Sequence, residues 1–120
     1  MAVRAIRGAT QLERDDPDEM REAVTELVSA MLEENALTSD SIISVLFTST
    51  PDLVSQFPAA AARHLELADV PLLCAREIDV PGALPRVVRV LAHVETPAPR
   101  PAVKHVYKRG AQALRPDLSA

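Results

Sequence analysis

The valine-rich run VVRVLAHVE, residues 87–95, constrains the fold more than any other stretch of the chain. A helical interpretation places Arg86, Arg89 and His93 on one face. However, β-branched side chains lose rotamer freedom on a helix, and alternation along a strand leaves one unbroken apolar face, so we predict a strand. The apolar face comprises Val88, Val90, Ala92 and Val94. Arg89 then lies on the opposite face, where its permanent charge requires solvent or a partner.

The clearest helix lies within residues 14–37. Asp16 suits the N-cap, Pro17 suits the first helical position, and Glu19 completes a capping box. Apolar residues recur at helical spacing and predict one buried face: Met20, Val24, Leu27, Val28, Met31 and Leu32. A second, short and alanine-rich helix is predicted to open at Pro58.

Further strands are predicted at residues 2–8, 42–47, 70–80 and 103–110. The segment 42–47 is nearly all apolar, which is typical of a strand covered on both faces. The order β-α-β-α-β-β-β predicts a single α+β domain over residues 1–120. Residues 111–120 are rich in turn formers, and we expect a flexible C-terminal tail. A chain of this length has little room for an enclosed pocket, so neighbouring subunits could complete one.

Composition argues against several function classes. The first 60 residues carry 4 basic and 11 acidic residues, and the remainder carry 9 and 6, with one Tyr and no Trp. Without stacking aromatics among the basic residues, nucleic acid is not an expected partner. With three glycines and one cysteine, we expect no phosphate-binding loop, disulfide or metal site. No stretch approaches the ~20 apolar residues that span a bilayer, so we expect a cytoplasmic protein away from membranes.

Arginine and tyrosine supply the side chains best suited to binding carboxylates. Candidates are Arg7, Arg63, Arg89, Arg115 and Tyr107. Taken singly, each arginine is more often a solvated or ion-paired residue, but the set favours a small ligand with more than one carboxylate. Cys74 has no histidine linked to it by a recognisable motif, which favours a buried hydrophobic role over nucleophilic catalysis.

Short motifs run in order through nearly the whole chain: IRGAT, ERD, TPDL, FPA, VPLLCAREIDV, RVLAHVET, HVY and LRPDL. Together they resemble the monofunctional chorismate mutases of the trimeric α+β class. The resemblance implies a five-stranded mixed sheet with helices on one side. It also implies three subunits packed around a threefold axis into a pseudo-α/β-barrel, with active sites at the subunit interfaces. The implied reaction is the cofactor-free Claisen rearrangement of chorismate to prephenate in phenylalanine and tyrosine biosynthesis.

The resemblance also implies roles for individual residues. Arg89 would donate to the ether oxygen and a carboxylate, while Arg7 and Tyr107 would bind carboxylates. Glu77, together with Cys74, would receive the ring hydroxyl and border the developing ring cation. Further implied substrate-binding residues are Leu73, Cys74, Ala75, Arg76, Phe57, Ala59, Arg63, Leu114 and Arg115.

The chain departs from the family pattern at two positions. Ala60 follows FPA where the family commonly has lysine, so we expect weaker electrostatic capture of a dianion. Leu73 stands where a small polar residue can occur. From the residues alone, a non-catalytic trimeric module that binds a small dicarboxylate metabolite and a structural trimer with a partner groove remain alternatives.

Overall fold

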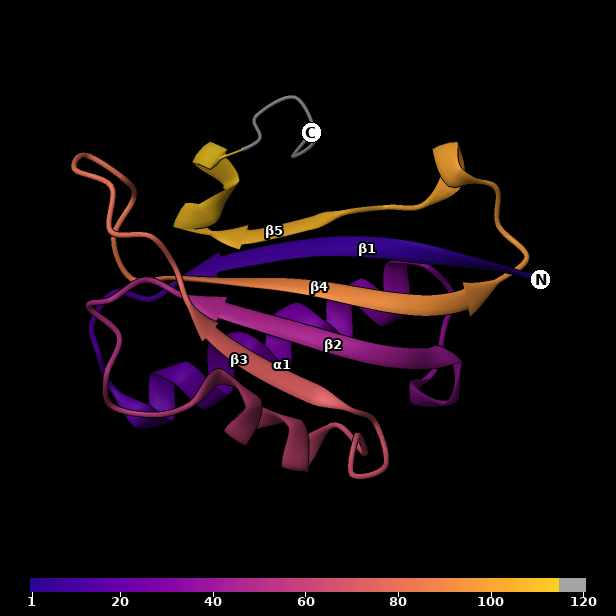
Figure 1. The fold of residues 1–120 in the computed structure, drawn as a ribbon, viewed down its shortest axis with the longest axis horizontal. Helices are drawn as coiled ribbons and strands as arrows, with labels where there is room; N and C mark the ends of the chain where they lie inside the picture. Colours follow the sequence, from indigo (N-terminus) through magenta and orange to yellow (C-terminus); the bar gives the residue numbers. More distant parts are fainter. Residues whose placement is uncertain (115–120) are drawn as a thin grey trace.

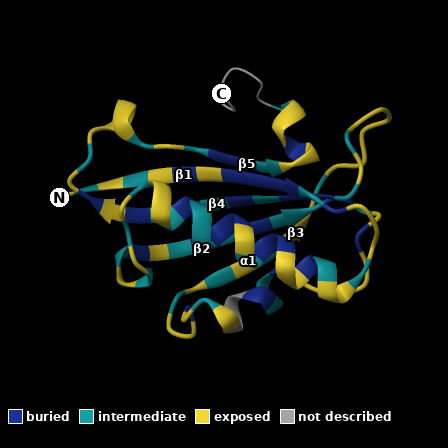
Figure 2. Ribbon diagram, turned by 180° about the vertical axis from the view of Figure 1, so that it is seen from behind, coloured by how far each residue is buried: buried dark blue, intermediate teal, exposed yellow. Residues whose placement is uncertain are grey.

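The computed structural model describes residues 1–114, without the side chains of residues 62 and 63. Its helix and strands are β1 (Ala2–Gln11), α1 (Pro17–Glu34), β2 (Ile42–Ser49), β3 (Leu72–Arg76), β4 (Val87–Thr96) and β5 (Val106–Arg109). The strands form one mixed sheet in the order β3-β2-β4-β1-β5 (Figure 1). Because α1 lies across one face of this sheet (Figure 2), the predicted α+β class with one-sided helices is confirmed.

The central strand β4 confirms the strand interpretation of the valine-rich run. It pairs antiparallel with β1 on one side and β2 on the other. Its predicted apolar face is buried, with exposed fractions of 0%, 3%, 6% and 0% at Val88, Val90, Ala92 and Val94. Arg89 therefore projects from the opposite face of the sheet.

The N-terminus of α1 forms as predicted, except for one half of the capping box. The Asp16 carboxylate accepts a hydrogen bond from the Glu19 backbone N–H at 2.8 Å, and Pro17 begins the helix. The Glu19 carboxylate does not return to the N-cap backbone. It accepts from the Glu13 N–H at 2.6 Å and thereby ties the preceding loop to the helix.

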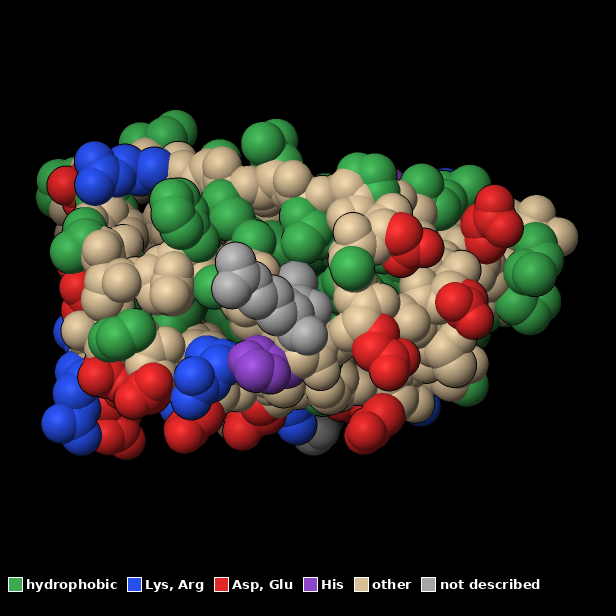
Figure 3. All heavy atoms as spheres, turned by 90° about the horizontal axis from the view of Figure 1, so that it is seen from below, with side chains coloured by type: hydrophobic (Ala, Val, Ile, Leu, Met, Phe, Trp, Pro, Cys, Tyr) green, Lys and Arg blue, Asp and Glu red, His purple; other side chains and the backbone are tan. Residues whose placement is uncertain are grey.

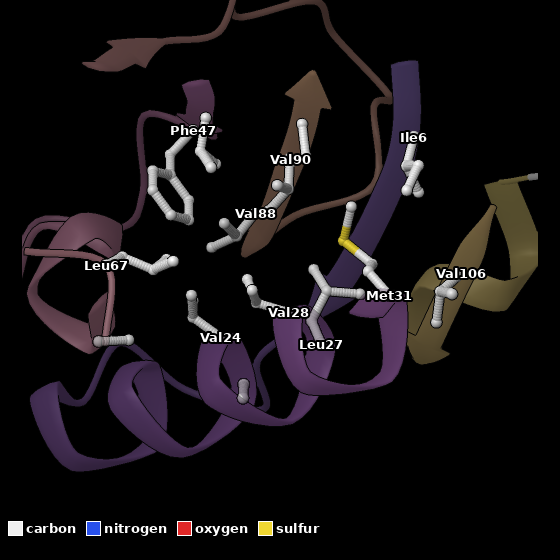
Figure 4. Packing of buried hydrophobic residues seen from close by; sticks show 14 of the residues in the cluster. Ile6, Val24, Leu27, Val28, Met31, Phe47, Leu67, Val88, Val90 and Val106 are labelled. Atoms are coloured by element: carbon white, nitrogen blue, oxygen red, sulfur yellow. The ribbon is translucent and has the colours of Figure 1, made fainter. Parts of the chain in front are cut away.

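The hydrophobic core fills the space between α1 and the sheet. Phe47, Val88 and Val90 of the sheet point toward Val24 and Val28 of the helix (Figure 4). β1 approaches the helix closely at Gly8, where an added Cβ would lie 2.5 Å from Met31 Sδ. The absence of a side chain at residue 8 thus allows α1 to pack directly against β1.

The prediction of a second α-helix is wrong. The segment Pro58–His64 forms a 3₁₀ turn and not an α-helix. The Ala60 N–H donates to the Phe57 carbonyl three residues earlier, at 3.0 Å. Seven residues give few α-helical hydrogen bonds to offset the cost of nucleation, so the tighter turn forms despite the alanines.

Four predicted strands have different ends. β2 continues to Ser49, two residues beyond its predicted end, and β5 is limited to Val106–Arg109 within the predicted 103–110. β1 continues to Gln11, three residues beyond the predicted end. β3 is limited to Leu72–Arg76, because its partner β2 ends at Ser49, opposite Arg76. The Val80 N–H then donates to the Ile78 carbonyl at 3.0 Å and turns the chain away from the sheet. The predicted C-terminal tail begins in a 3₁₀ turn, Gly110–Leu114, and its residues from 115 onward lie outside the described part.

The face of the sheet opposite α1, which we call the open face, carries no α-helix among the described residues. Strand register and side-chain alternation place these residues on it: Val3, Ala5, Arg7, Ser44, Leu46, Thr48, Leu73, Ala75, Arg89, Leu91 and His93. All of them are exposed or half-buried. The prediction that the apolar segment 42–47 is covered on both faces is therefore wrong within one chain, because α1 covers only one face of this strand. Among the described helices, none has the length and apolar character needed to cross a membrane.

Candidate active site

Arg89 and Glu77 form a direct ion pair at the end of the open face. Arg89 Nη1 donates to Glu77 Oε1, and the Thr48 hydroxyl donates to Glu77 Oε2 at 2.7 Å. The Glu77 backbone N–H donates to the Ser49 carbonyl at 2.9 Å, which fixes this residue beyond the end of β3. No partner for Arg89 was evident from its neighbours in the sequence, because Glu77 precedes it by 12 positions and only the sheet brings the two together.

Two neighbouring cavities meet at Arg89. The first has a volume of about 830 Å³, and Arg89, Glu77 and Arg76 line it together with part of the 78–85 loop. The second has a volume of about 220 Å³, and Arg7 and Tyr107 line it together with Arg89. The four residues predicted to be catalytic therefore gather around adjoining hollows in one chain.

Tyr107 lines the smaller cavity and carries a buried hydroxyl. Tyr107 is 7% exposed, and its buried hydroxyl has no hydrogen-bond partner within the described residues. The ring packs with Ala9 and Ala111, and Leu114 lies against the same cluster. Burial of an unpaired hydroxyl is costly, and a bound carboxylate would accept its proton.

A second group of predicted residues lines a separate cavity of about 420 Å³. Phe57, Cys74 and Ala75 contribute to it, and Arg76 lines both this cavity and the larger one. Phe57 is 71% exposed and Leu73 is 65% exposed. Hydrophobic side chains thus lie at the surface along the β3 edge of the molecule (Figure 3).

The remaining predicted contacts fall outside these cavities or outside the described part. Ala59 is half-buried and packs against the core, so in one chain it lines none of these cavities. Cys74 also packs partly against the core, in line with a hydrophobic role. The side chain of Arg63 and all of Arg115 lie outside the described residues.

Asp15 anchors the loop that leads to Phe57. Its carboxylate accepts hydrogen bonds from the backbone N–H groups of Val54, at 3.2 Å, and Ser55, at 3.0 Å. Burial alone raises the pKa of Asp15, but hydrogen bonds from the Ser55 side chain and from both backbone groups outweigh it, so the pKa lies below its ordinary value. The loop is therefore held by an ionised carboxylate.

These features define a class of protein: a small α+β chain whose two adjoining cavities are lined by three arginines (Arg7, Arg76 and Arg89), three carboxylates (Asp52, Glu77 and Asp79) and the phenol of Tyr107. In the part of the chain that the structure describes, no three of the His, Cys, Asp and Glu side chains are placed to hold a metal ion. The site offers charge and hydrogen bonds rather than an activated nucleophile.

The family model for chorismate mutase type I matches residues 3–118, and the chain belongs to this family of enzymes. It is 51% identical to a chorismate mutase, AroH, of Thermus thermophilus over 119 residues, which cover 98% of both chains. It is 40% identical to the AroH enzyme of Bacillus subtilis, over 99% of this chain and 94% of that one. The solved chorismate mutase of Clostridium thermocellum superposes with a TM-score of 0.90 at 44% identity, over 92% of this chain and 98% of that chain. The resemblance of the short motifs to those of chorismate mutases is thereby confirmed.

The structure adds one residue that the sequence argument missed. Thr48 lines both cavities that meet at Arg89, and its hydroxyl binds Glu77. Alternation along β2 could have placed Thr48 on the same face as Arg89. Nothing in the local sequence pointed to Glu77 as its partner.

Proposed function

We propose that this enzyme accelerates the rearrangement of chorismate to prephenate by placing the Arg89 guanidinium against the ether oxygen as its bond to carbon breaks. The observation that carries the proposal is the position of Arg89 where the two cavities meet. Negative charge grows on the ether oxygen in the transition state, so a fixed cation binds that state more tightly than the substrate. Arginine has five N–H donors, so Arg89 can keep its bond to Glu77 while it donates to the ligand.

The other side chains of the site would hold the substrate in its reactive shape. Arg7 and Tyr107 line the smaller cavity beside Arg89 and would bind the carboxylates. Glu77 would accept the ring hydroxyl and lie near the positive charge that develops on the ring. Holding a flexible molecule in one conformer removes much of the entropic part of the barrier.

We further propose a homotrimer in which each active site is shared between two subunits. The open face carries apolar side chains without cover in one chain, and three such faces around a threefold axis would enclose a pseudo-α/β-barrel. Phe57 and Leu73 are largely exposed and lie away from the cavity that Tyr107 lines. A neighbouring subunit would bring its own Phe57, Leu73–Arg76, Ala59 and Arg63 to the site, with Leu114 and Arg115 closing it.

The reaction is tested by mixing purified protein with chorismate, following the loss of diene absorbance and identifying prephenate as the product. We expect acceleration without added metal or cofactor. Binding without acceleration would favour the dicarboxylate-binding module instead. The same proposal places the enzyme in the cytoplasm, within phenylalanine and tyrosine biosynthesis.

The shared site is tested by mixing two inactive variants and allowing their subunits to exchange. Arg89→Ala damages one half of the site, and Phe57→Asp places a repelling carboxylate in the other half. A mixed trimer regains an intact site wherever the undamaged half of one subunit meets that of its neighbour. The matched control pairs Arg89→Ala with Arg7→Ala, which damage the same half and should regain nothing. Equal activity in both mixtures would contradict a site between subunits.

A further inference from the structure

Thr48 lies opposite Arg89 in the antiparallel register of β2 and β4. Side chains that face each other across two strands are separated by about 5 Å at Cβ, so these two share one stretch of the open face. The Thr48 side chain also lines both cavities that meet at Arg89. Its place in the fold therefore makes it part of the wall of the proposed site.

The Thr48 hydroxyl is committed to Glu77. It donates its single proton to Glu77 Oε2 at 2.7 Å, while Arg89 donates to Oε1 of the same carboxylate. Both carboxylate oxygens are thus held from two different strands. Since the proton of Thr48 is already used, the hydroxyl serves the ligand through Glu77 and not as a direct donor.

Glu77 needs such a restraint because it lies just beyond the end of β3. Its backbone is attached to the sheet by the bond to the Ser49 carbonyl, but the chain after it leaves the sheet in the 78–85 loop. A glutamate side chain with three rotatable bonds loses considerable entropy on being fixed in one orientation. Thr48 is β-branched and belongs to a paired strand, so its own hydroxyl direction is well determined.

We infer that Thr48 is a positioning residue of the active site: its hydroxyl fixes the Glu77 carboxylate, and through it the Arg89 guanidinium, in the orientation that the rearrangement requires. This inference rests on the roles proposed above for Glu77 and Arg89. Thr48, which lies on β2, thereby joins Glu77 and Arg89 as a third residue of the group.

The test is a set of substitutions at residue 48 with steady-state kinetics and thermal unfolding. Thr48→Val keeps the shape and removes the hydroxyl, and we expect kcat to fall about tenfold, with a smaller change in KM, because a hydrogen bond to a charged group is lost. Thr48→Ser keeps the hydroxyl and should remain within about threefold of the parent enzyme. Ser44→Ala is the matched control: this hydroxyl lies on the same face of β2 and pairs with His93, not with Glu77.

A double-mutant cycle separates positioning from a general structural role. If Thr48 acts through the carboxylate, Thr48→Val should change the residual rate of a Glu77→Ala enzyme by less than about twofold. If Thr48→Val lowers the rate of the Glu77→Ala enzyme by the same factor as it lowers the rate of the parent enzyme, the inference is overturned. Parent-like kinetics of Thr48→Val alone also overturn it. If Thr48→Val does not fold, Thr48→Ala is measured in the same cycle.

The same cycle distinguishes a failure of the proposed role of Glu77 from a failure of the role of Thr48. Parent-like activity of Glu77→Ala contradicts the proposed role of Glu77, and the inference about Thr48 fails with it. A strongly impaired Glu77→Ala enzyme alongside a fully active Thr48→Val enzyme contradicts only the role of Thr48.

Discussion

Arg89 and Glu77 form an ion pair within one chain, and their side chains are 36% and 15% exposed. A partly exposed ion pair contributes little to the stability of a fold, because solvent weakens the attraction and two side chains lose freedom. Its larger effect is orientation, because the pair fixes the direction of the Arg89 guanidinium. Arg89 thus has a structural partner and a proposed chemical role at the same time.

Arg89→Ala should lower kcat by about 10²–10³, the loss typical of removing one donor to a developing negative charge. The free energy of unfolding should change by less than about 1 kcal/mol, because the lost pair is partly exposed. Kinetics with chorismate and urea unfolding measure the two effects. Arg4→Ala is the control, since Arg4 lies at the far end of β1 and its Nε donates to the Ala98 carbonyl. A marked loss of stability with kcat retained would make Arg89 a structural residue.

Tyr107→Phe should raise KM for chorismate about tenfold while leaving the thermal midpoint unchanged or slightly higher. The hydroxyl is buried without a described partner, so its removal breaks no hydrogen bond among the described residues and relieves a desolvated group. The ring, which packs with Ala9 and Ala111, remains. Calorimetry measures the thermal midpoint, and steady-state kinetics measure KM. A clear drop in midpoint would instead point to a structural hydrogen bond.

Gly8→Ala should destabilise the protein by about 1–3 kcal/mol, because the new methyl group meets the buried Met31 side chain at 2.5 Å. The strand or the helix must then move. Met31→Ala supplies the matched test. If the clash is the cause, the double variant should be more stable than the sum of the two single losses predicts. Additive losses in chemical denaturation would exclude that explanation.

The stability that Asp15 contributes should disappear in acid. Its folded pKa lies below the ordinary value of 3.8, so ionised Asp15 stabilises the fold above that value, and the contribution is lost as the pH falls through the folded pKa. Asp15→Asn should therefore be less stable than the parent at about pH 6, and the difference should shrink below about pH 4. Denaturation at several pH values measures this. A difference that stays constant with pH would assign the loss to shape alone.

Local patterns predicted the elements whose signals are contained in a few residues. Asp16 and Pro17 marked the start of α1, and alternation around Arg89 marked β4. The alanines after Pro58 led to the wrong prediction of an α-helix, because intrinsic helix preference does not offset the free-energy cost of nucleation in so short a segment.

The contacts of the site needed the folded chain. Thr48, Glu77 and Arg89 come from three separate segments, and only strand pairing brings their side chains together. Phe57 and Leu73 were predicted as site residues through the family resemblance, yet one chain leaves both of them exposed. Surfaces that a neighbouring copy would cover look like ordinary exposure when a single chain is considered.

The alternation of β4 sets limits on how this enzyme can change. Substitutions on the side of Arg89, Leu91 and His93 alter the open face without repacking the core between the sheet and α1. A single inserted or deleted residue within the strand is different, because it exchanges the two faces beyond that point. A deletion at Val88 would turn the guanidinium toward α1 and the valines toward the cavities. We therefore expect tolerated variation in this strand to consist of replacements, with length changes confined to the loops at either end.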